Sequence, residues 1–253
     1  MSALKKVDIN CDLGEHYGNT KSSIDHLIMP HISSCNIACG FHSGDPLTIH
    51  NTILLALDHN VSIGAHPSFP DLQGFGRRNI QMNSQELKQI IIYQVSALKG
   101  MVESTGAKLR HVKPHGALYN MAANDSAYAY AIIEAIQSID QNLILFGLSG
   151  SLITELAQEK GLTIRHEVFI DRKYEDDLSL RNRQHDDAIL HTDAAISQLD
   201  MFVSEQSVLT YSQHEKEINV DTICIHSDTP DAAAMAVLIS KHLESLHIEI
   251  SAH

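Results

Sequence analysis

Ionisable side chains gather at the ends of short apolar runs in this sequence. The clusters are DINCDLGE at 8–15, GFHSGD at 40–45, GAHPSF at 64–69 and HVKPHGALYN at 111–120. An apolar run of four to eight residues that is closed by Gly or Pro indicates a buried strand. Buried strands do not usually end in charged side chains, so several that do predict a shared polar site at one end of a sheet or barrel. This layout is typical of an enzyme.

The first cluster places three polar side chains on one face of a predicted strand. Asp8, Asn10 and Asp12 alternate with Ile9 and Cys11, and the two-residue period of a strand puts the three polar groups on the same side. In a barrel that face lines the interior near its mouth. In an open sheet it is a solvent-facing edge, and the residues alone leave both readings open.

Two histidines, His42 and His66, follow two successive predicted strands and each has glycine or proline beside it. Two histidines and a carboxylate from neighbouring strand ends are a common ligand set for a first-row divalent metal. The alternative is that both are structural histidines, which is weakened because both occupy the same place in a strand–loop unit.

The fourth cluster contains Lys113 and His115 on either side of Pro114, which forces an extended backbone on the lysine. A lysine at the end of a buried strand is costly unless a charge or a substrate compensates it. Lys113 is therefore a candidate for stabilising an oxyanion or a phosphate. His115 is a candidate metal ligand or general acid–base. The alternative for Lys113 is a side chain that reaches solvent at the rim.

Further candidates lie in loops. Arg77 belongs to the glycine-containing segment FGRR at 75–78 and suits a carboxylate or phosphate, although a surface role is equally compatible. His226 and Asp228 follow the last predicted strand and could reach the same mouth. His111 and the remaining histidines away from strand ends are treated as background.

Strands and helices are predicted to alternate along the chain. The predicted strands are 7–12, 33–39, 61–65, 109–113, 143–147, 163–170 and 222–226, and the predicted helices are 47–59, 84–105, 126–139, 152–160, 192–205 and 230–247. The alternation indicates parallel strands with helical crossovers. A dinucleotide-binding sheet would need G-x-G-x-x-G after the first strand, and DLGEHYG does not match.

Because polar clusters follow many strands rather than one crevice, we expect an α/β fold with a closed (β/α) barrel. Residues 1–253 are expected to form a single domain, with a long polar βα loop near 171–191.

Composition narrows the class of protein. The net charge is −13 over 253 residues, which argues against binding to nucleic acid or to an anionic membrane surface. The sequence has no apolar stretch near twenty residues and no signal-peptide pattern at its N-terminus. Its four cysteines form no C-x-x-C pair, which suits reduced thiols. A cytoplasmic protein is expected.

The motifs together resemble the LamB/YcsF family. The matching segments are D-x-N-x-D-x-G-E at 8–15, NIACGFHSGD at 36–45, GAHPSFPD at 64–71, FGRR at 75–78, VKPHGALYN at 112–120 and IHSD at 225–228. The family is similar in fold to the glycoside hydrolase/deacetylase superfamily, whose members are irregular seven-stranded (β/α) barrels. Leu178 and Asn182 stand where the family usually has Gly and Pro, so the 171–191 loop is expected to differ in shape.

The resemblance implies ATP-dependent hydrolysis of 5-oxo-L-proline (pyroglutamate) to L-glutamate, by an A subunit that works with two further 5-oxoprolinase subunits. ATP is then a co-substrate. Because no G-x-x-x-x-G-K-[ST] motif occurs, partner subunits are candidates for binding it. The alternative is a stand-alone, metal-dependent deacetylase or amidohydrolase acting on a lactam, N-acyl or carbohydrate substrate. The sequence leaves a homo-oligomer open.

The resemblance also implies roles for individual residues. The candidates are Asp8, Asp12, Glu15, Lys113 and His115 for catalysis, Arg77 and Asn120 for substrate binding, and Asp12, His42 and His66 for a divalent metal. The metal is expected by analogy with the metal-dependent deacetylases of the same superfamily.

Overall fold

Seven parallel strands close into a barrel, which confirms the predicted fold class. The computed structural model describes residues 4–17, 24–228 and 231–252. The barrel strands are β1 (Lys6–Leu13), β2 (Ser34–Ala38), β3 (Ser62–His66), β4 (His111–Val112), β5 (Ile144–Leu148), β6 (Ile164–Phe169) and β9 (Thr222–Ile225). Each strand pairs in parallel with the next, and β9 pairs with both β6 and β1, so the ring is closed.

Three further strands lie outside the ring. β10 (Glu249–Ile250) pairs with the first two residues of β1. β7 (Ser207–Leu209) and β8 (Glu215–Glu217) form an antiparallel hairpin. The sequence prediction missed these strands because segments of two or three residues are too short to show a period of two.

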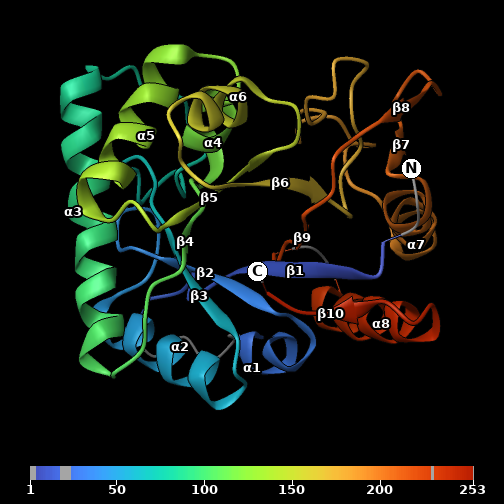
Figure 1. Cartoon of the computed structure of the whole chain (residues 1–253), viewed down its shortest axis with the longest axis horizontal. Coiled ribbons are helices and arrows are strands. Elements are labelled where there is room, and N and C mark those ends of the chain that lie inside the picture. Colours follow the sequence, from blue (N-terminus) through green and yellow to red (C-terminus); the bar gives the residue numbers. More distant parts are fainter. Residues whose placement is uncertain (1–3, 18–23, 229–230, 253) are drawn as a thin grey trace.

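Helices cover the outside of the barrel (Figure 1). They are α1 (Asp25–Ile28), the 3-10 turn η1 (Met29–His31), α2 (Pro46–Asp58), α3 (Ser84–Ser104), α4 (Gly116–Ala122), α5 (Ser126–Ile139), α6 (Leu152–Glu159), α7 (Thr192–Asp200), the π-helical turn η2 (Met201–Glu205) and α8 (Ala232–Ser245). The barrel strands and the longer helices match the predicted segments closely, and residue 230 of the last predicted helix lies outside the described residues. None of the described helices is long and apolar enough to cross a bilayer.

The start of α2 fixes the loop that carries the second polar cluster. Asp45 Oδ1 accepts hydrogen bonds from the backbone N–H groups of Leu47 and Thr48 at 2.9 and 3.1 Å, and Pro46 is the first helical residue. This cap satisfies N–H groups that a helix end leaves without partners. The loop from β2 is thereby held firmly where it enters α2.

The interior of the barrel is polar. Asp8, Asn10 and Asp12 are all buried, which excludes the solvent-facing edge and confirms that one face of β1 lines the interior. Asn10 Nδ2 donates to Glu167 Oε1 at 3.0 Å and to Thr222 Oγ1 at 2.8 Å. These bonds tie β1 to β6 and β9 through side chains, in addition to the backbone pairing.

His111 belongs to this interior, so treating it as background was wrong. Its Nε2 lies 2.8 Å from Asn36 Oδ1, an acceptor, and its ring stacks on Phe146 with 4.1 Å between centroids. A Cβ atom at Gly64 would lie 2.0 Å from His111 Nε2, so glycine on β3 leaves the space that the ring fills. Burial lowers the pKa of His111 to about 3, which keeps the ring neutral.

Candidate active site

A cavity of about 920 Å³ opens beside the carboxyl ends of the barrel strands. It brings together seven of the residues predicted from the sequence, namely Asp12, Glu15, His66, Arg77, Lys113, His115 and Asn120. His42 lies behind this lining and is almost fully buried. Parallel βα units place their functional residues at this end of a barrel, so the convergence follows from the fold.

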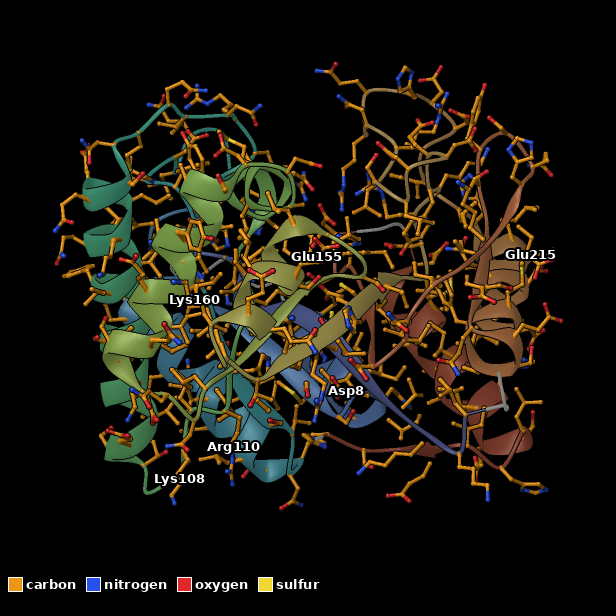
Figure 2. All side chains as sticks on the ribbon, turned by 45° about the horizontal axis from the view of Figure 1, so that its top comes forward. Asp8, Lys108, Arg110, Glu155, Lys160 and Glu215 are labelled. Carbon is orange, nitrogen blue, oxygen red and sulfur yellow. The ribbon has the colours of Figure 1, made fainter. Side chains whose placement is uncertain are left out.

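Asp8 is the predicted catalytic residue that the structure does not bring to the cavity. Its carboxylate accepts hydrogen bonds from Ser33 and Ser34 Oγ at 2.5 and 2.7 Å and from Thr222 Oγ1 at 2.5 Å. Its partners stand where β2 and β9 begin, at the opposite end of the strands from the cavity, and Figure 2 shows Asp8 among the central strands. The alternation along β1 predicted the correct face for Asp8 but not its position along the barrel axis. We therefore infer that Asp8 links β1 to its neighbouring strands.

Three imidazole rings surround the carboxylate of Glu15. Its Oε1 lies 2.9 Å from His42 Nε2, 3.3 Å from His115 Nδ1 and 3.9 Å from His66 Nε2. One donor atom from each of the four residues falls within 4.8 Å of all the others. The carboxylate that reaches all three rings is thus Glu15. Asp12, the carboxylate predicted for the metal, contacts only one of the three rings, that of His66, at 3.3 Å.

Hydrogen bonds on the outer side of each ring set its tautomer. His66 Nδ1 lies 2.7 Å from the Lys113 carbonyl, and His115 Nε2 lies 2.8 Å from the Phe75 carbonyl, so both nitrogens must donate. Ser68 Oγ donates to a backbone carbonyl and therefore accepts from His42 Nδ1 at 2.9 Å. Each neutral ring consequently turns its unprotonated nitrogen inward.

The inward-facing atoms repel one another unless positive charge lies between them. His66 Nε2 and His115 Nδ1, both acceptors, are only 2.9 Å apart. Burial lowers the pKa values of His42 and His115 well below the usual range, whereas burial raises the pKa of Glu15. Burial would also lower the pKa of His66, but Asp12 raises it above its usual value. Protons or a cation must therefore occupy this space. Three imidazoles and a carboxylate, each ring oriented by an outer hydrogen bond, are a donor set that fits a first-row divalent metal.

The 75–78 loop packs against this cluster. Phe75 and Gly76 both have left-handed backbones, with φ of +54° and +64°, and this turn directs the Phe75 carbonyl to His115. A Cβ atom at Gly76 would lie 2.8 Å from His115 and 3.0 Å from His42. Only glycine allows the loop to approach both rings so closely.

Lys113 is buried and its charge is already compensated. Its Nζ lies 2.7 Å from Glu167 Oε1 and 3.0 Å from Asp12 Oδ1. Burial alone would lower the pKa of Lys113, but Asp12, Cys224 and Glu167 hold it well above its usual range. Burial would likewise raise the pKa of Asp12, and His66 and Lys113 lower it well below its usual range. The lysine therefore keeps Asp12 ionised, and it is not the solvent-reaching rim residue of the alternative reading.

A second histidine–carboxylate pair borders the same cavity. His226 Nδ1 lies 2.9 and 3.0 Å from the two carboxylate oxygens of Asp171 and donates to them, which leaves Nε2 as an acceptor. The ring stacks on Phe169 with 5.2 Å between centroids. A His226 ring nitrogen, an Asp12 oxygen and Cys224 Sγ all lie within 4.8 Å of one another. A ring held in one tautomer beside an ionised carboxylate is equipped to move protons.

The loop that follows β6 forms one wall of the cavity. Leu178, where the resembled family has glycine, adopts φ of +66°, a left-handed conformation that side-chain-bearing residues rarely adopt. Arg183 from this loop and Arg77 both contact Asp228. Asn120 lines the cavity from α4 and is exposed.

Sequence reasoning missed Glu167 and Asp171 as site residues. Glu167 lies in a predicted strand two residues before Phe169, so a carboxylate on the inward face was the available signal. Asp171 ends that strand as His66 and Lys113 end theirs, but it was counted with the polar loop. Asp171 thus belongs to the strand-end pattern that marked the other residues, whereas Glu167 lies within the strand.

Comparison with known proteins identifies the family. The model of the LamB/YcsF family matches residues 7–253. The chain belongs to the LamB/YcsF family.

Relatives in the LamB/YcsF family match over nearly the whole chain. The chain is 47% identical to the A subunit of 5-oxoprolinase from Bordetella parapertussis, over 97% of this chain and 98% of the relative. The crystal structure of a lactam utilization protein from Thermus thermophilus superposes with a TM-score of 0.92 at 38% identity, covering 98% of this chain and 100% of that one.

A more distant neighbour bears on the fold alone. It is a family 4 carbohydrate esterase from Streptomyces lividans in complex with acetate, with a TM-score of 0.51 and 9% identity, over 98% of this chain and 93% of that one. The LamB/YcsF chain therefore shares its barrel fold with that esterase.

Proposed function

We propose that this chain takes part in the ATP-dependent hydrolysis of 5-oxo-L-proline to L-glutamate, as the A subunit of a cytoplasmic 5-oxoprolinase with two further kinds of subunit. The name of the Bordetella parapertussis relative, 47% identical over 97% of the chain, supports the substrate and the assembly. The likeness to a lactam utilization protein from Thermus thermophilus supports a lactam substrate. No phosphate-binding motif of the Walker A type occurs in the sequence, so we assign ATP binding to the partner subunits.

The reaction explains why ATP is needed. A five-membered lactam is an unstrained, resonance-stabilised amide, so water attacks it slowly. Phosphorylation of the lactam oxygen converts a poor electrophile into a good one. ATP donates its γ-phosphoryl group to the lactam oxygen and leaves as ADP. One water adds to the activated carbonyl carbon, and the C–N bond breaks as a proton passes to the nitrogen, which gives a γ-glutamyl phosphate. A second water cleaves this acyl phosphate to glutamate and phosphate.

The observation that carries the hydrolytic site is the set of three inward-facing imidazole nitrogens around Glu15. We infer that His42, His66, His115 and Glu15 hold a divalent metal. When bound, such a metal supplies Lewis acidity that polarises a carbonyl group and makes water more acidic.

The remaining residues have roles that follow from their contacts. His226, with Nδ1 committed to Asp171, is the proton donor and acceptor at Nε2. Asp12, kept ionised by Lys113, places a fixed negative charge near this ring. Arg77 and Asn120 line the cavity where a substrate would contact them.

The direct test is an assay of ATP-dependent 5-oxo-L-proline hydrolysis with the chain alone, with the partner subunits alone and with all subunits together. We expect glutamate to form only in the complete mixture. A complete mixture that cleaves ATP and forms no glutamate from 5-oxo-L-proline would refute the proposal.

A second candidate function is hydrolysis of an N-acyl or lactam substrate by the chain alone, without ATP. The four-residue His/Glu cluster favours it, because such a centre can cleave an amide without a nucleotide. Release of acetate from N-acetylated sugars by the purified chain would establish it, and inertness of the metal-loaded chain would remove it.

A further inference from the structure

Three arginines converge on the outer part of the cavity. Arg77 comes from the loop after β3, and Arg172 and Arg183 come from the loop after β6. Asp228, which follows β9, lines the same region. A carboxylate between guanidinium groups is the arrangement by which arginine recognises small oxyanions.

Asp228 bridges two of these arginines. Its Oδ2 pairs with Arg77 Nη2 and lies 3.3 Å from Arg183 Nη1. Burial would raise the pKa of Asp228, but Arg183 and Arg77 lower it below its usual value, so this carboxylate is ionised. Both arginines and Asp228 remain partly exposed, and an external anion can therefore reach them.

Arg172 has unused binding capacity. The residue is 6% exposed, its Nη2 donates to the Arg181 carbonyl, and its Nε has no hydrogen-bond partner among the described residues. It forms no ion pair within the described part of the chain. Burial, with Arg183 and Arg77 nearby, lowers the pKa of Arg172 to about 10. A buried guanidinium with an orphaned donor is costly unless a ligand compensates it.

We propose that Arg77, Arg172 and Arg183 form a subsite for a compact oxyanion, and that Asp228 occupies it until the ligand arrives. Two of these arginines share Asp228 and the third, Arg172, has no ion pair among the described residues, in a protein whose net charge is −13. This local excess of positive charge directs an anion into one part of the cavity. The ligand displaces Asp228 from its two arginines and gains the orphaned donor of Arg172.

The subsite lies next to the histidine cluster. The Arg77 guanidinium stands 5.0 Å from the centroid of the Phe75 ring. The same ring packs edge-on against His42 and His115, with centroids 5.4 and 5.2 Å apart. One aromatic ring thus separates the two parts, which matches a small ligand with an anionic group at one end and an amide at the other. Assigning the anion to the carboxylate of 5-oxo-L-proline rests on the proposed function; a phosphate group presents the same chemistry.

The test measures binding to the full-length chain by calorimetry with three probes: 5-oxo-L-proline, 2-pyrrolidinone, which is the same lactam without the carboxylate, and inorganic phosphate. In Arg183→Gln we expect the affinity for the anionic probe to fall at least tenfold. In Asp228→Asn we expect it to rise severalfold, because the internal competitor loses its charge. If Arg183 and Asp228 had only a structural role, the two substitutions would change the affinity for the anionic probe in the same direction.

Arg110→Gln is the matched control. It removes one positive charge from an exposed residue before β4, which Figure 2 shows at the lower edge of the molecule, and it should leave every affinity unchanged. Tighter binding of 5-oxo-L-proline than of 2-pyrrolidinone, lost in Arg183→Gln, identifies the substrate carboxylate. The same pattern with phosphate alone supports the subsite while counting against 5-oxo-L-proline as its ligand. Failure of both anions to bind, or equal effects of the two substitutions, overturns the proposal.

Discussion

Lys113 Nζ and Glu167 Oε1 lie 2.7 Å apart inside the barrel, where both side chains are almost fully excluded from solvent. The lysine had the sequence signature of an anion-binding residue at a strand end. In the structure its Nζ is shared by two carboxylates, those of Glu167 and Asp12, and the residue lines the cavity. The pair connects β4 to β6 and fixes the charge of the residue beside His66.

Lys113→Met should destabilise the protein and abolish turnover. The substitution leaves two buried carboxylates without their cation, which costs about 3–5 kcal/mol when one partner of a buried pair is removed. Urea unfolding should therefore show a lower free energy of unfolding. Adding Glu167→Gln should restore a large part of that stability and none of the turnover. A Lys113→Met protein as stable as the wild type would show that the pair is unimportant for folding.

His66→Ala should remove the bound divalent metal. The ring contributes one of the four donors, which include Glu15, and its loss leaves a set too weak to retain the ion. Elemental analysis after gel filtration should give about one equivalent of metal for the wild type and much less for the variant. His226→Gln, outside this four-residue group, should keep its metal. A wild type that takes up no divalent ion after reconstitution would mean that protons alone separate the imidazole nitrogens.

His226→Gln should lower turnover by about 10²–10⁴-fold, the usual contribution of a general acid–base. The fold should be unchanged because the residue lies at the cavity wall. Asp171→Asn should also lower turnover, since an amide no longer fixes the histidine tautomer. Steady-state rates in the complete subunit mixture provide the measurement. If His226→Gln keeps turnover within about threefold of the wild type, His226 is not the general acid–base.

The buried ring of His111 makes stability fall in acid. Its pKa is about 3 in the folded protein against 6.5 as the ordinary value, so the unfolded chain binds the extra proton between these limits. The free energy of unfolding therefore does not change with the titration of His111 well above pH 6.5. It falls as the pH drops below that value, by about 2 kcal/mol at pH 5.

His111→Gln should therefore reduce the difference in unfolding free energy between pH 7.5 and pH 5 by about 2 kcal/mol. Urea denaturation at the two pH values measures it. His59→Gln, at an exposed position on the end of α2, should leave the difference unchanged. An unaltered difference in His111→Gln would indicate that the ring is charged in the folded protein.

The strands were predictable because each is a local apolar run whose end is marked by glycine, proline or charge. Alternation along β1 put Asp8, Asn10 and Asp12 on one face, and only the closed barrel shows that this face is buried. Pairings between distant strands, such as Lys113 with Glu167, depend on register and barrel closure, which no local pattern contains. Depth along a strand was equally hidden, which is why Asp8 was grouped with residues at the other end of the barrel.

The sequence could predict which strand ends contribute residues to the site. It could not predict what each residue does there. His42 and His66 could be paired from their matching positions. The inward direction of the imidazole nitrogens depends on the carbonyls of Phe75 and Lys113, and a backbone carbonyl leaves no mark in the sequence. The left-handed backbone at Leu178 was equally hidden, because leucine does not indicate a positive φ.

Closure of the barrel through β1 sets an order for biosynthesis. The N-terminal strand pairs early with β2, but its other neighbour is β9, which ends at Ile225 of the 253 residues. During synthesis one edge of β1 stays unpaired until β9 has left the ribosome, late in translation. An unpaired strand edge is prone to aggregate. A nascent chain of this protein therefore depends on protection of its first strand for nearly the whole of its translation.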